Sequence, residues 1–156
     1  MTHATTHTAE TIAEYVTVTL DGQIFGLPIA RVQDVFMPES LTRVPLSSPE
    51  IAGVLNLRGR IVTAIDLRRR LGLPPREHAM RPMAVGIEWR GESYGLLVDA
   101  VGEVIRLPDS GREPNPVNLD PAFADVSAGI HRLEAQLLVV LDVERALVSP
   151  ADPIAA

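Results

Sequence analysis

The sequence predicts a mainly β fold built from two related units, each a small closed barrel of about five short strands. Three observations predict it. The chain repeats itself once, its apolar residues alternate with polar ones over short stretches, and glycine-containing turns separate these stretches. A barrel suits such short strands because closing a sheet removes its exposed edges. Two barrels side by side would also form a groove where they meet.

The internal repeat consists of two blocks that recur in the same order. Residues 15–35 match residues 84–104 at an offset of 69, and residues 52–66 match residues 128–142 at an offset of 76. The identical glycine pairs are Gly22 with Gly91, Gly26 with Gly95, and Gly53 with Gly129. Paired glycines favour duplication over chance, because a glycine usually serves a tight turn or a close backbone approach. Since a solenoid needs about three repeats, two copies predict a pair of subdomains.

The repeat also sets the expected domain boundaries. We expect a disordered tail over residues 1–13, one domain over 14–148 and a C-terminal tail over 149–156; within the domain, the first copy covers about 15–72, a linker 73–82 and the second copy about 83–148. The N-terminal residues lack the basic end and apolar centre of a secretory signal. No apolar run approaches the roughly 18 residues of a membrane span. We therefore expect a cytoplasmic protein without direct membrane insertion.

The strands of the first copy begin with a hairpin. Val16, Val18 and Leu20 alternate with threonines, Asp21-Gly22 supplies a turn, and residues 24–29 return. Further strands are predicted at residues 32–37, 53–58 and 61–66, and a short helix at 67–71. The second copy repeats this order, with strands at residues 85–89, 94–98, 101–107, 129–133 and 137–142 and a helix at 143–148. Its seven extra residues fall within residues 109–125, which we expect to form an enlarged loop.

Composition excludes several classes of chemistry. The chain has no cysteine, which rules out disulfides, thiol nucleophiles and thiolate metal sites. All fourteen basic residues are arginine, so lysine Schiff-base catalysis and a phosphate-loop lysine are ruled out as well. The net charge of −6 opposes nucleic-acid binding, because displacing phosphate counterions needs a positive field. We therefore expect no nucleic-acid partner.

The four histidines do not form a set of metal ligands. His3 and His7 lie in the N-terminal tail, His78 lies in the linker, and His131 stands alone in a predicted strand. Since no two of them have ligand spacing on one element, we expect no metal site. No nucleophile elbow, Walker loop or dinucleotide-binding glycine turn occurs either. We therefore expect a protein that is not an enzyme and has no catalytic residues.

Three aspartates, Asp66, Asp99 and Asp142, each close an apolar strand. A carboxylate pair for acid–base catalysis is one interpretation. Helix capping is the favoured one, because Asp66 and Asp142 occupy equivalent positions just before the two predicted helices. Residues 68–70, which read Arg-Arg-Arg, could form an anion site, but we expect them to form a solvated helix face.

Residues 56–60 read Asn-Leu-Arg-Gly-Arg, whereas their partners 132–136 read Arg-Leu-Glu-Ala-Gln. The leucine is kept while the cation becomes an acid, so a role for the polar residues is indicated. Arg58 offers five donors in a rigid fork, which suits the carboxylates or backbone carbonyls of a partner. The structural alternative is an ion pair between the copies, joining Arg58 to Asp34 or to Glu134. Both interpretations are open at this point.

A longer stretch resembles a known family. Residues 51–67 read Ile-Ala-Gly-Val-Leu-Asn-Leu-Arg-Gly-Arg-Ile-Val-Thr-Ala-Ile-Asp-Leu, similar to the signature of the CheW-like domain of bacterial chemotaxis coupling proteins. Residues 42–45 (Thr-Arg-Val-Pro), Gly26, and residues 97–101 (Leu-Val-Asp-Ala-Val) also resemble the family in the expected order. The resemblance covers about residues 14–148. Because the chain ends soon afterwards, we expect the stand-alone form.

The resemblance implies a fold and a function. The fold is two five-stranded SH3-like barrels, with the further implication that strands exchange between barrels, so that the halves of the sequence need not be the halves in space. The function is that of a non-catalytic adaptor that couples methyl-accepting chemoreceptors, through their signalling tip, to the regulatory CheW-like domain of the histidine kinase CheA. Such a protein would be recruited to membrane-associated chemoreceptor arrays and would need no cofactor.

The resemblance also assigns residues to two surfaces. The receptor-binding and coupling residues are Arg58, Asn56, Val32, Asp34, Val35, Val101 and Val104. The kinase-binding residues are Leu41, Thr42 and Val44. A receptor helix hairpin would place apolar side chains in the groove between the barrels, while Arg58 fixes its register or supports the groove wall.

Three alternatives stay open. The chain could serve a related chemosensory pathway that does not drive flagella, could be a double barrel that binds a small ligand, or could be an enzyme with an unrecognised site. The aromatic content of 4% speaks against a barrel that stacks nucleobases.

Overall fold

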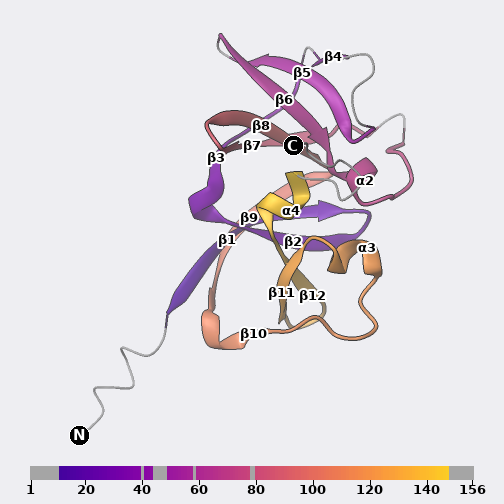
Figure 1. Ribbon diagram of the computed structural model, residues 1–156. Helices are drawn as coiled ribbons and strands as arrows, with labels where there is room; N and C mark the ends of the chain where they lie inside the picture. Colours follow the sequence, from indigo (N-terminus) through magenta and orange to yellow (C-terminus); the bar gives the residue numbers. More distant parts are fainter. Residues whose placement is uncertain (1–10, 40, 44–48, 58, 78–79, 148–156) are drawn as a thin grey trace, which may run out of the picture.

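The computed structural model describes residues 11–39, 41–43, 49–57, 59–77 and 80–147 of the chain. These residues form twelve strands in two sheets of six, with only short helices (Figure 1), so the prediction of a mainly β fold is confirmed. The predicted count of five strands is exceeded in each sheet by one strand of two residues, which is too short to leave a pattern in the sequence. None of the described helices is long and apolar enough to cross a membrane.

The two sheets are named A and B here. Sheet A contains β1 (Ile12–Leu20), β2 (Gln23–Pro28), β9 (Ala100–Pro108), β10 (Arg112–Glu113), β11 (Ser127–Arg132) and β12 (Leu137–Leu141) in the order β10-β11-β12-β2-β1-β9. Sheet B contains β3 (Val32–Phe36), β4 (Leu41–Thr42), β5 (Ile51–Leu57), β6 (Arg60–Asp66), β7 (Met83–Trp89) and β8 (Glu92–Val98) in the order β3-β7-β8-β6-β5-β4. Sheet B lies in the upper half of Figure 1, and β10 to β12 lie in the lower half.

The two copies exchange their first hairpins. The β1–β2 hairpin of the first copy pairs with strands of the second, and the β7–β8 hairpin of the second copy joins sheet B. The exchange occurs at two parallel strand pairs, β12–β2 and β6–β8. In these pairs Val139 lies opposite Phe25 and Thr63 lies opposite Tyr94, which are equivalent positions under the two offsets of the repeat. The duplication therefore extends to the strand register.

Both exchanged hairpins have the predicted two-residue turns. Asp21 and Gly22 have φ values of 50° and 84°, and Arg90 and Gly91 have 53° and 78°. Two consecutive left-handed residues match the twist of a tight hairpin, which explains the glycine at the second position. These turns fix the β1–β2 and β7–β8 registers.

The paired Gly53 and Gly129 have equivalent structural roles. Each lies at a register shift, in the β5–β6 and β11–β12 pairs, with φ values of 150° and 126°. A Cβ atom on Gly53 would collide with the carbonyl group of Thr42 in β4, and one on Gly129 would lie 3.0 Å from the carbonyl oxygen of Glu113 in β10. The glycines therefore allow the two-residue edge strands β4 and β10 to approach.

The apolar core has three parts. Each sheet encloses a small cluster of its own, with Leu55, Val62 and Leu97 in sheet B and Tyr15 and Leu138 in sheet A. A larger shared core lies between the sheets, and its fully buried members include Leu20, Phe25, Ile87, Leu96, Ile130 and Leu141. Central strands such as β8 and β12 alternate between a sheet cluster and the shared core, so they are apolar on both faces.

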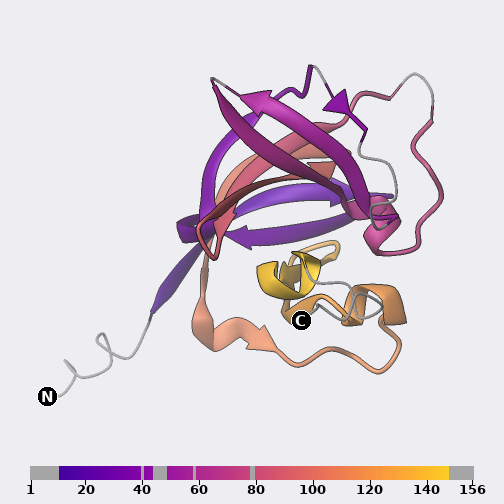
Figure 2. The same cartoon turned by 45° about the horizontal axis from the view of Figure 1, so that its top comes forward.

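Both sheets are curled. Phe36 at one end of sheet B packs against the same cluster as Leu55 of β5, although three strands separate β3 from β5 in the sheet. Figure 2 shows this curvature in β5 and β6, which lie above β1 and β2. Ile105 and Leu133 close sheet A in the same way.

Short helices follow the last strand of each copy, as predicted. Asp66 caps α2 (Leu67–Arg70) by accepting a hydrogen bond from the backbone N–H of Arg68 at 3.1 Å. Asp142 precedes α4 (Val143–Leu147) and accepts a bond from the N–H of Arg145 at 3.2 Å. Capping is therefore the role that the structure gives to both aspartates.

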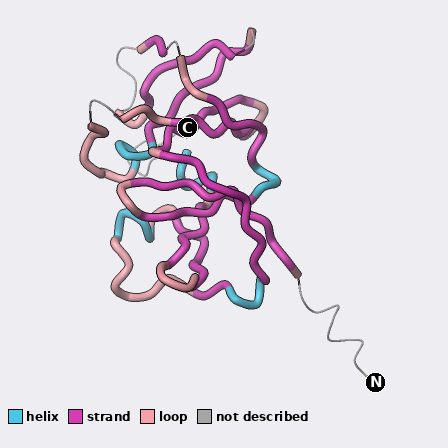
Figure 3. Tube along the Cα trace, turned by 180° about the vertical axis from the view of Figure 1, so that it is seen from behind, coloured by secondary structure: helices cyan, strands magenta, loops and turns pink. Residues whose placement is uncertain are grey.

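The enlarged loop of the second copy has some regular structure. It contains a 3-10 turn η2 (Asp109–Gly111), β10 and α3 (Pro121–Ala124), which Asp120 caps. In the first copy a 3-10 turn η1 (Ile29–Arg31) joins β2 to β3. The tube in Figure 3 shows how little of the chain is helical.

Candidate partner-binding site

The Asn-Leu-Arg-Gly segment forms the turn between β5 and β6. The side-chain oxygen Oδ1 of Asn56 accepts a hydrogen bond of 3.0 Å from the backbone N–H of Gly59, whose φ is 83°. Asn56 therefore shapes the turn through its own side chain. Arg58, between these residues, lies outside the described part of the chain, so the choice between partner contact and ion pairing stays a prediction. The turn between β11 and β12 uses a different bond, from the N–H of Leu133 to the carbonyl of Gln136 at 2.8 Å.

The four predicted groove valines lie on the edge strands β3 and β9. Val32 and Val101 both pack against the shared core between the sheets. Val35 and Val104, their neighbours three residues along, are 41% and 46% exposed. The valines thus divide into an inner and an outer pair, each related by the offset of 69. The outer pair is partly exposed, and its role as a partner contact stays a prediction.

Asp34 lies half-buried on β3, with its side chain over Gly86 of β7. A Cβ atom on residue 86 would collide with Oδ1 of Asp34, so the glycine provides the space for this carboxylate. Oδ1 is buried and has no hydrogen-bond partner in the described part of the chain. A buried carboxylate oxygen without a hydrogen-bond donor costs free energy, so a donor placed beside it would be stabilising.

The predicted kinase-binding residues lie at the other edge of sheet B. Leu41 and Thr42 form the exposed two-residue strand β4, which pairs with Val54 and Leu55 of β5. Val44 lies outside the described residues. Leu41 also lines a cleft of about 430 Å³, together with Met37, Pro38, Leu97 and residues 80–82.

A second cleft, of about 400 Å³, lies between the exit of β3 and β5. Phe36, Asn56 and Leu57 contribute to its wall, together with the segment 37–39. Met37 and Pro38 line both clefts, so the structure brings Asn56 and Leu41 to neighbouring parts of one surface.

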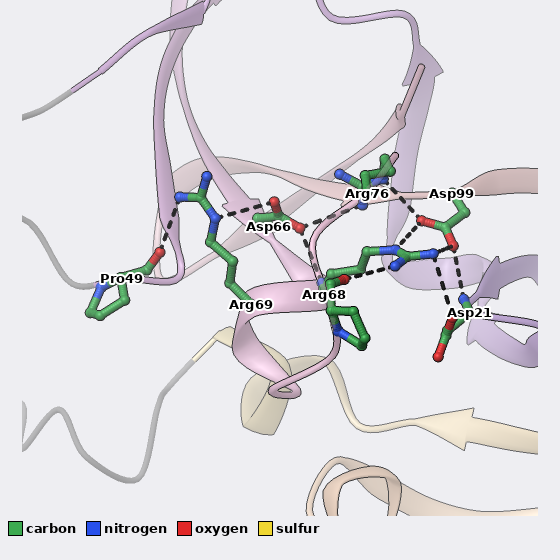
Figure 4. A network of polar contacts seen from close by, with 8 residues as sticks. Asp21, Pro49, Asp66, Arg68, Arg69, Arg76 and Asp99 are labelled. Carbon is green, nitrogen blue, oxygen red and sulfur yellow. Dashed lines mark hydrogen bonds and ion pairs between the residues drawn. The ribbon is translucent and has the colours of Figure 1, made fainter. Parts of the chain in front are cut away.

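A cluster of charged residues, which sequence reasoning missed, lies at the junction of the sheets (Figure 4). Arg68 of α2 donates from Nε to Oδ1 of Asp99 at 2.8 Å and from Nη2 to Oδ2 at 2.7 Å. Asp99 connects β8 of sheet B to β9 of sheet A, and it also accepts from the backbone N–H of Asp21 at 2.8 Å. Arg76 of the linker adds a bond to Asp99 of 2.9 Å. The cluster therefore ties the linker and both sheets together.

The geometry of this cluster controls the pKa of Asp99. Burial alone would raise that pKa, but hydrogen bonds from Arg68, from the backbone of Asp21 and from Arg76 outweigh burial and lower it to about 2. The same pairing raises the pKa of Arg68. The Asp99 carboxylate is therefore ionised at neutral pH, which fits a structural ion pair and not a proton-transfer site.

The prediction of a solvated face for residues 68–70 is wrong for two of the three arginines. Arg68 is only 6% exposed, and the side chain of Arg70 is equally buried, with a bond from its Nη2 to the carbonyl of Arg145 at 2.7 Å. Arg69 alone has a substantially exposed side chain. The helix is a single turn packed at the junction of the sheets, so its neighbouring residues cannot share one solvent face.

His131 is the one described histidine, and its ring packs inside sheet A. It is 3% exposed and lies 5.7 Å from the ring of Tyr15, and Nε2 has no hydrogen-bond partner among the described residues. Burial, reinforced by the charge of Arg112, lowers its pKa. Within the described residues no group of three or more His, Asp or Glu side chains could hold a metal ion.

Comparison with known proteins identifies the family. The model of the CheW-like domain matches residues 14–151, nearly the whole chain. The chain belongs to the CheW-like domain family. The matched residues include nearly all of both sheets.

Individual CheW proteins are similar over most of their length. The chemotaxis protein CheW of Bacillus subtilis is 33% identical over 129 residues, which are 82% of each chain. The CheW of Thermotoga maritima is 27% identical over 132 residues, or 85% of each chain. Among solved structures, the scaffolding protein TtCheW from Thermoanaerobacter tengcongensis superposes with a TM-score of 0.75 at 30% identity, covering 84% of this chain and 89% of that one. The structural similarity thus extends over most of both chains.

Proposed function

We propose that the chain is a non-catalytic adaptor that couples methyl-accepting chemoreceptors to the histidine kinase CheA. The match of the CheW-like family over residues 14–151 carries this proposal. The geometry supports it, because the predicted receptor contacts Val35 and Val104 lie on β3 and β9 and the predicted kinase contacts Leu41 and Thr42 lie on β4. Asn56, of the receptor set, lies on β5 beside β4, so the two contact surfaces adjoin each other. An adaptor needs two such surfaces so that both partners bind at once.

The receptor surface of the proposal consists of Val35 and Val104 together with the β5–β6 turn. A receptor helix would pack its apolar residues against the two valines, and Arg58 would donate to its carboxylates or carbonyls. Val32 and Val101 would support this surface from the shared core. Asp34, half-buried on the same strand as Val35, is the remaining predicted contact of this surface.

The kinase surface of the proposal is centred on Leu41 and Thr42. Val44, the third predicted kinase contact, lies outside the described residues. The exposed edge of β4 would meet the regulatory CheW-like domain of the kinase. This contact would join two related modules through different surfaces. Such heterologous contacts can close into rings or extend into arrays. The chain would then act in the cytoplasm, recruited to membrane-associated receptor arrays.

Reconstitution from purified components tests the proposal. The chain, a receptor signalling-tip fragment and the kinase should elute together on size-exclusion chromatography, and the receptor should activate the kinase only when the chain is present. Formation of the complex should consume no substrate. Absence of the ternary complex, with each pair also failing to bind, would contradict the proposed function.

The variant Arg58→Glu sharpens the test. It should keep the far-UV circular dichroism spectrum of the native chain while weakening receptor-dependent kinase activation by about tenfold. Arg132→Glu, which changes an exposed arginine of sheet A, is the matched control and should leave activation unchanged. An unfolded Arg58→Glu variant would support the structural ion pair instead.

A further inference from the structure

Between the strands that the structure describes, the chain crosses from one sheet to the other twice, at equivalent places in the repeat. The first crossing passes through η1 from β2 to β3, and the second passes through Asp99 from β8 to β9. Under the offset of 69, Asp99 corresponds to Ala30 in the middle of η1. β3 and β9 are edge strands of their sheets, and both carry predicted receptor contacts. A difference between the crossings therefore affects that surface.

The second crossing is fixed by bonds to three separate segments (Figure 4). The side chain of Asp99 binds Arg68 of α2 and Arg76 of the linker. It also accepts from the backbone N–H of Asp21 at 2.8 Å, and the N–H of Asp99 donates to the carbonyl of Thr19 at 3.0 Å. Because hydrogen bonds between buried charged groups are strong, the start of β9 is held to sheet A and to the linker at once.

The first crossing has no such cluster in the described part of the chain. Ala30 is exposed and has no polar side chain, and none of the residues in η1 is buried. The residue equivalent to Arg68 is Glu144, which is exposed and forms no ion pair with another described residue. The bond that closes η1 runs within the turn itself, from the N–H of Val32 to the carbonyl of Ile29. Side chains therefore fix one crossing and not the other.

The two edge strands differ in the same direction. Both have a register shift at the same point of the repeat. In the β1–β9 pair, the hydroxyl of Thr17 donates to the carbonyl of Glu103 at 2.7 Å across this shift. The equivalent residues of the β3–β7 pair are Gly86 and Asp34, so the donor is missing, and Oδ1 of Asp34 has no partner among the described residues. β9 is also nine residues long, whereas β3 has five.

We infer that β9 is the fixed wall of the predicted receptor surface and that β3, hinged at η1, is its adjustable wall. Receptor binding then selects one position of β3, and the spacing of Val35 and Val104 changes with it. Asp99 and Thr17 are positioning residues in this arrangement, because they act on the partner only through β9. The inference rests on the proposed function for the identity of the partner, whereas the difference between the strands rests on the contacts above.

Amide hydrogen exchange of the full chain, followed by NMR, tests the difference between the strands without any partner. The hydrogen-bonded amides of β3 should exchange at least about tenfold faster than those of β9, because opening β3 breaks fewer bonds. Thr17→Val removes one hydrogen bond and should speed exchange in β9 by about fivefold, with no change in β3. Thr19→Val, on the same strand, is the matched control and should leave both strands as in the native chain. Equal exchange of β3 and β9 in the native chain would overturn the inference.

Distances between paired spin labels test the movement itself. The chain has no cysteine, so Gln33→Cys or Glu88→Cys can each be combined with Arg106→Cys and labelled specifically. Gln33 on β3 and Glu88 on β7 are exposed and joined by one hydrogen bond of 3.0 Å, so both labelled pairs lose the same bond. By double electron–electron resonance, the β3–β9 distance distribution should be broader than the β7–β9 distribution. It should narrow when a receptor signalling-tip fragment binds.

The outcomes separate this inference from the proposed function. Equal widths for the two labelled pairs in the free chain would overturn the inference, whatever the partner does. A broad β3–β9 distribution that does not narrow when the fragment is bound would also overturn it, because the receptor would then select no position of β3. A fragment that does not bind the native chain would contradict the proposed function instead, and faster exchange of β3 would still support an adjustable wall.

Discussion

Arg68 and Asp99 form a two-point ion pair, 2.8 and 2.7 Å long, at the point where the chain crosses from sheet B to sheet A. Both side chains are at most 10% exposed, so water competes little for these bonds. The pair differs from the exposed bridge of Arg132 with Glu113, which lies at the edge of sheet A. A contribution to stability is therefore expected from the first pair and hardly any from the second.

Removing Asp99 should destabilise the protein strongly. Asp99→Ala removes the carboxylate that Arg68 and Arg76 both bind most closely, in a buried site, so we expect a loss of about 3 kcal/mol in the free energy of unfolding. Urea denaturation followed by circular dichroism measures it. Glu113→Ala, which breaks the exposed bridge, should cost less than about 1 kcal/mol. Equal losses in the two variants would show that the junction cluster has no special role.

The same carboxylate predicts an acid-sensitive stability. The pKa of Asp99 is about 2 in the folded chain, below its ordinary value of 3.8, so the unfolded chain binds more protons as the pH falls through this range. Stability from the pair is therefore fully present above about pH 5 and is lost towards pH 2, with a total of about 2 kcal/mol. Urea midpoints at successive pH values should fall more steeply for the native chain than for Asp99→Asn. Parallel curves would contradict the lowered pKa.

His131 predicts a second pH dependence nearer to neutrality. Burial lowers its pKa, so below about pH 6.5 the unfolded chain takes up a proton more readily than the folded chain. Stability should decrease as the pH falls through this region, and His131→Gln should remove that component. Thermal unfolding midpoints of both chains between pH 7.5 and 5.5, chosen to stay about one unit either side of the unperturbed histidine pKa, give the comparison. A native midpoint that falls no further than that of His131→Gln would exclude the effect.

The contact of Asp34 with Gly86 can be tested by a double-mutant cycle. Gly86→Ala places a methyl group where Oδ1 of Asp34 lies, so we expect a loss of about 1–3 kcal/mol in stability. Asp34→Ala makes room, and the double variant should recover part of this loss, which corresponds to a coupling of at least about 0.5 kcal/mol. Denaturant unfolding of the four proteins measures it. If the stability losses of the two single variants simply add in the double variant, the Asp34 side chain is not what opposes the new methyl group.

The hairpins, their turns and the helix caps could be predicted because each depends on neighbouring residues. Asp21-Gly22 and Arg90-Gly91 specify tight turns whatever surrounds them, and Asp66 caps a helix that begins at the next residue. The exchange of hairpins could not be derived from pattern alone, because β1–β2 and β7–β8 have the same alternation and fit either sheet. Only the resemblance to the CheW-like family suggested it.

The junction cluster was beyond sequence reasoning for a different reason. Arg68 and Asp99 are 31 residues apart, and Asp21 and Asp99 are 78 apart, so no local pattern joins them. One signal was present: Asp99 ends a strand in the second copy, whereas the equivalent residue in the first copy is Ala30. A charged residue without a counterpart at a repeated position marks a place where the two copies have acquired different partners. Of the predicted contact residues, Arg58 and Val44 lie outside the described residues, and the roles of the others stay predictions.

Each repeat donates a hairpin to the other, so neither half of the sequence contains the strands of one complete sheet. A fragment cut within residues 73–82 would leave one half without its central β7–β8 pair and the other without β1–β2. The two fragments should therefore remain unfolded alone and become ordered only on mixing, as in obligate dimers that have no stable folded monomer. The covalent connection then serves to raise the local concentration of each half for the other, which makes assembly independent of dilution.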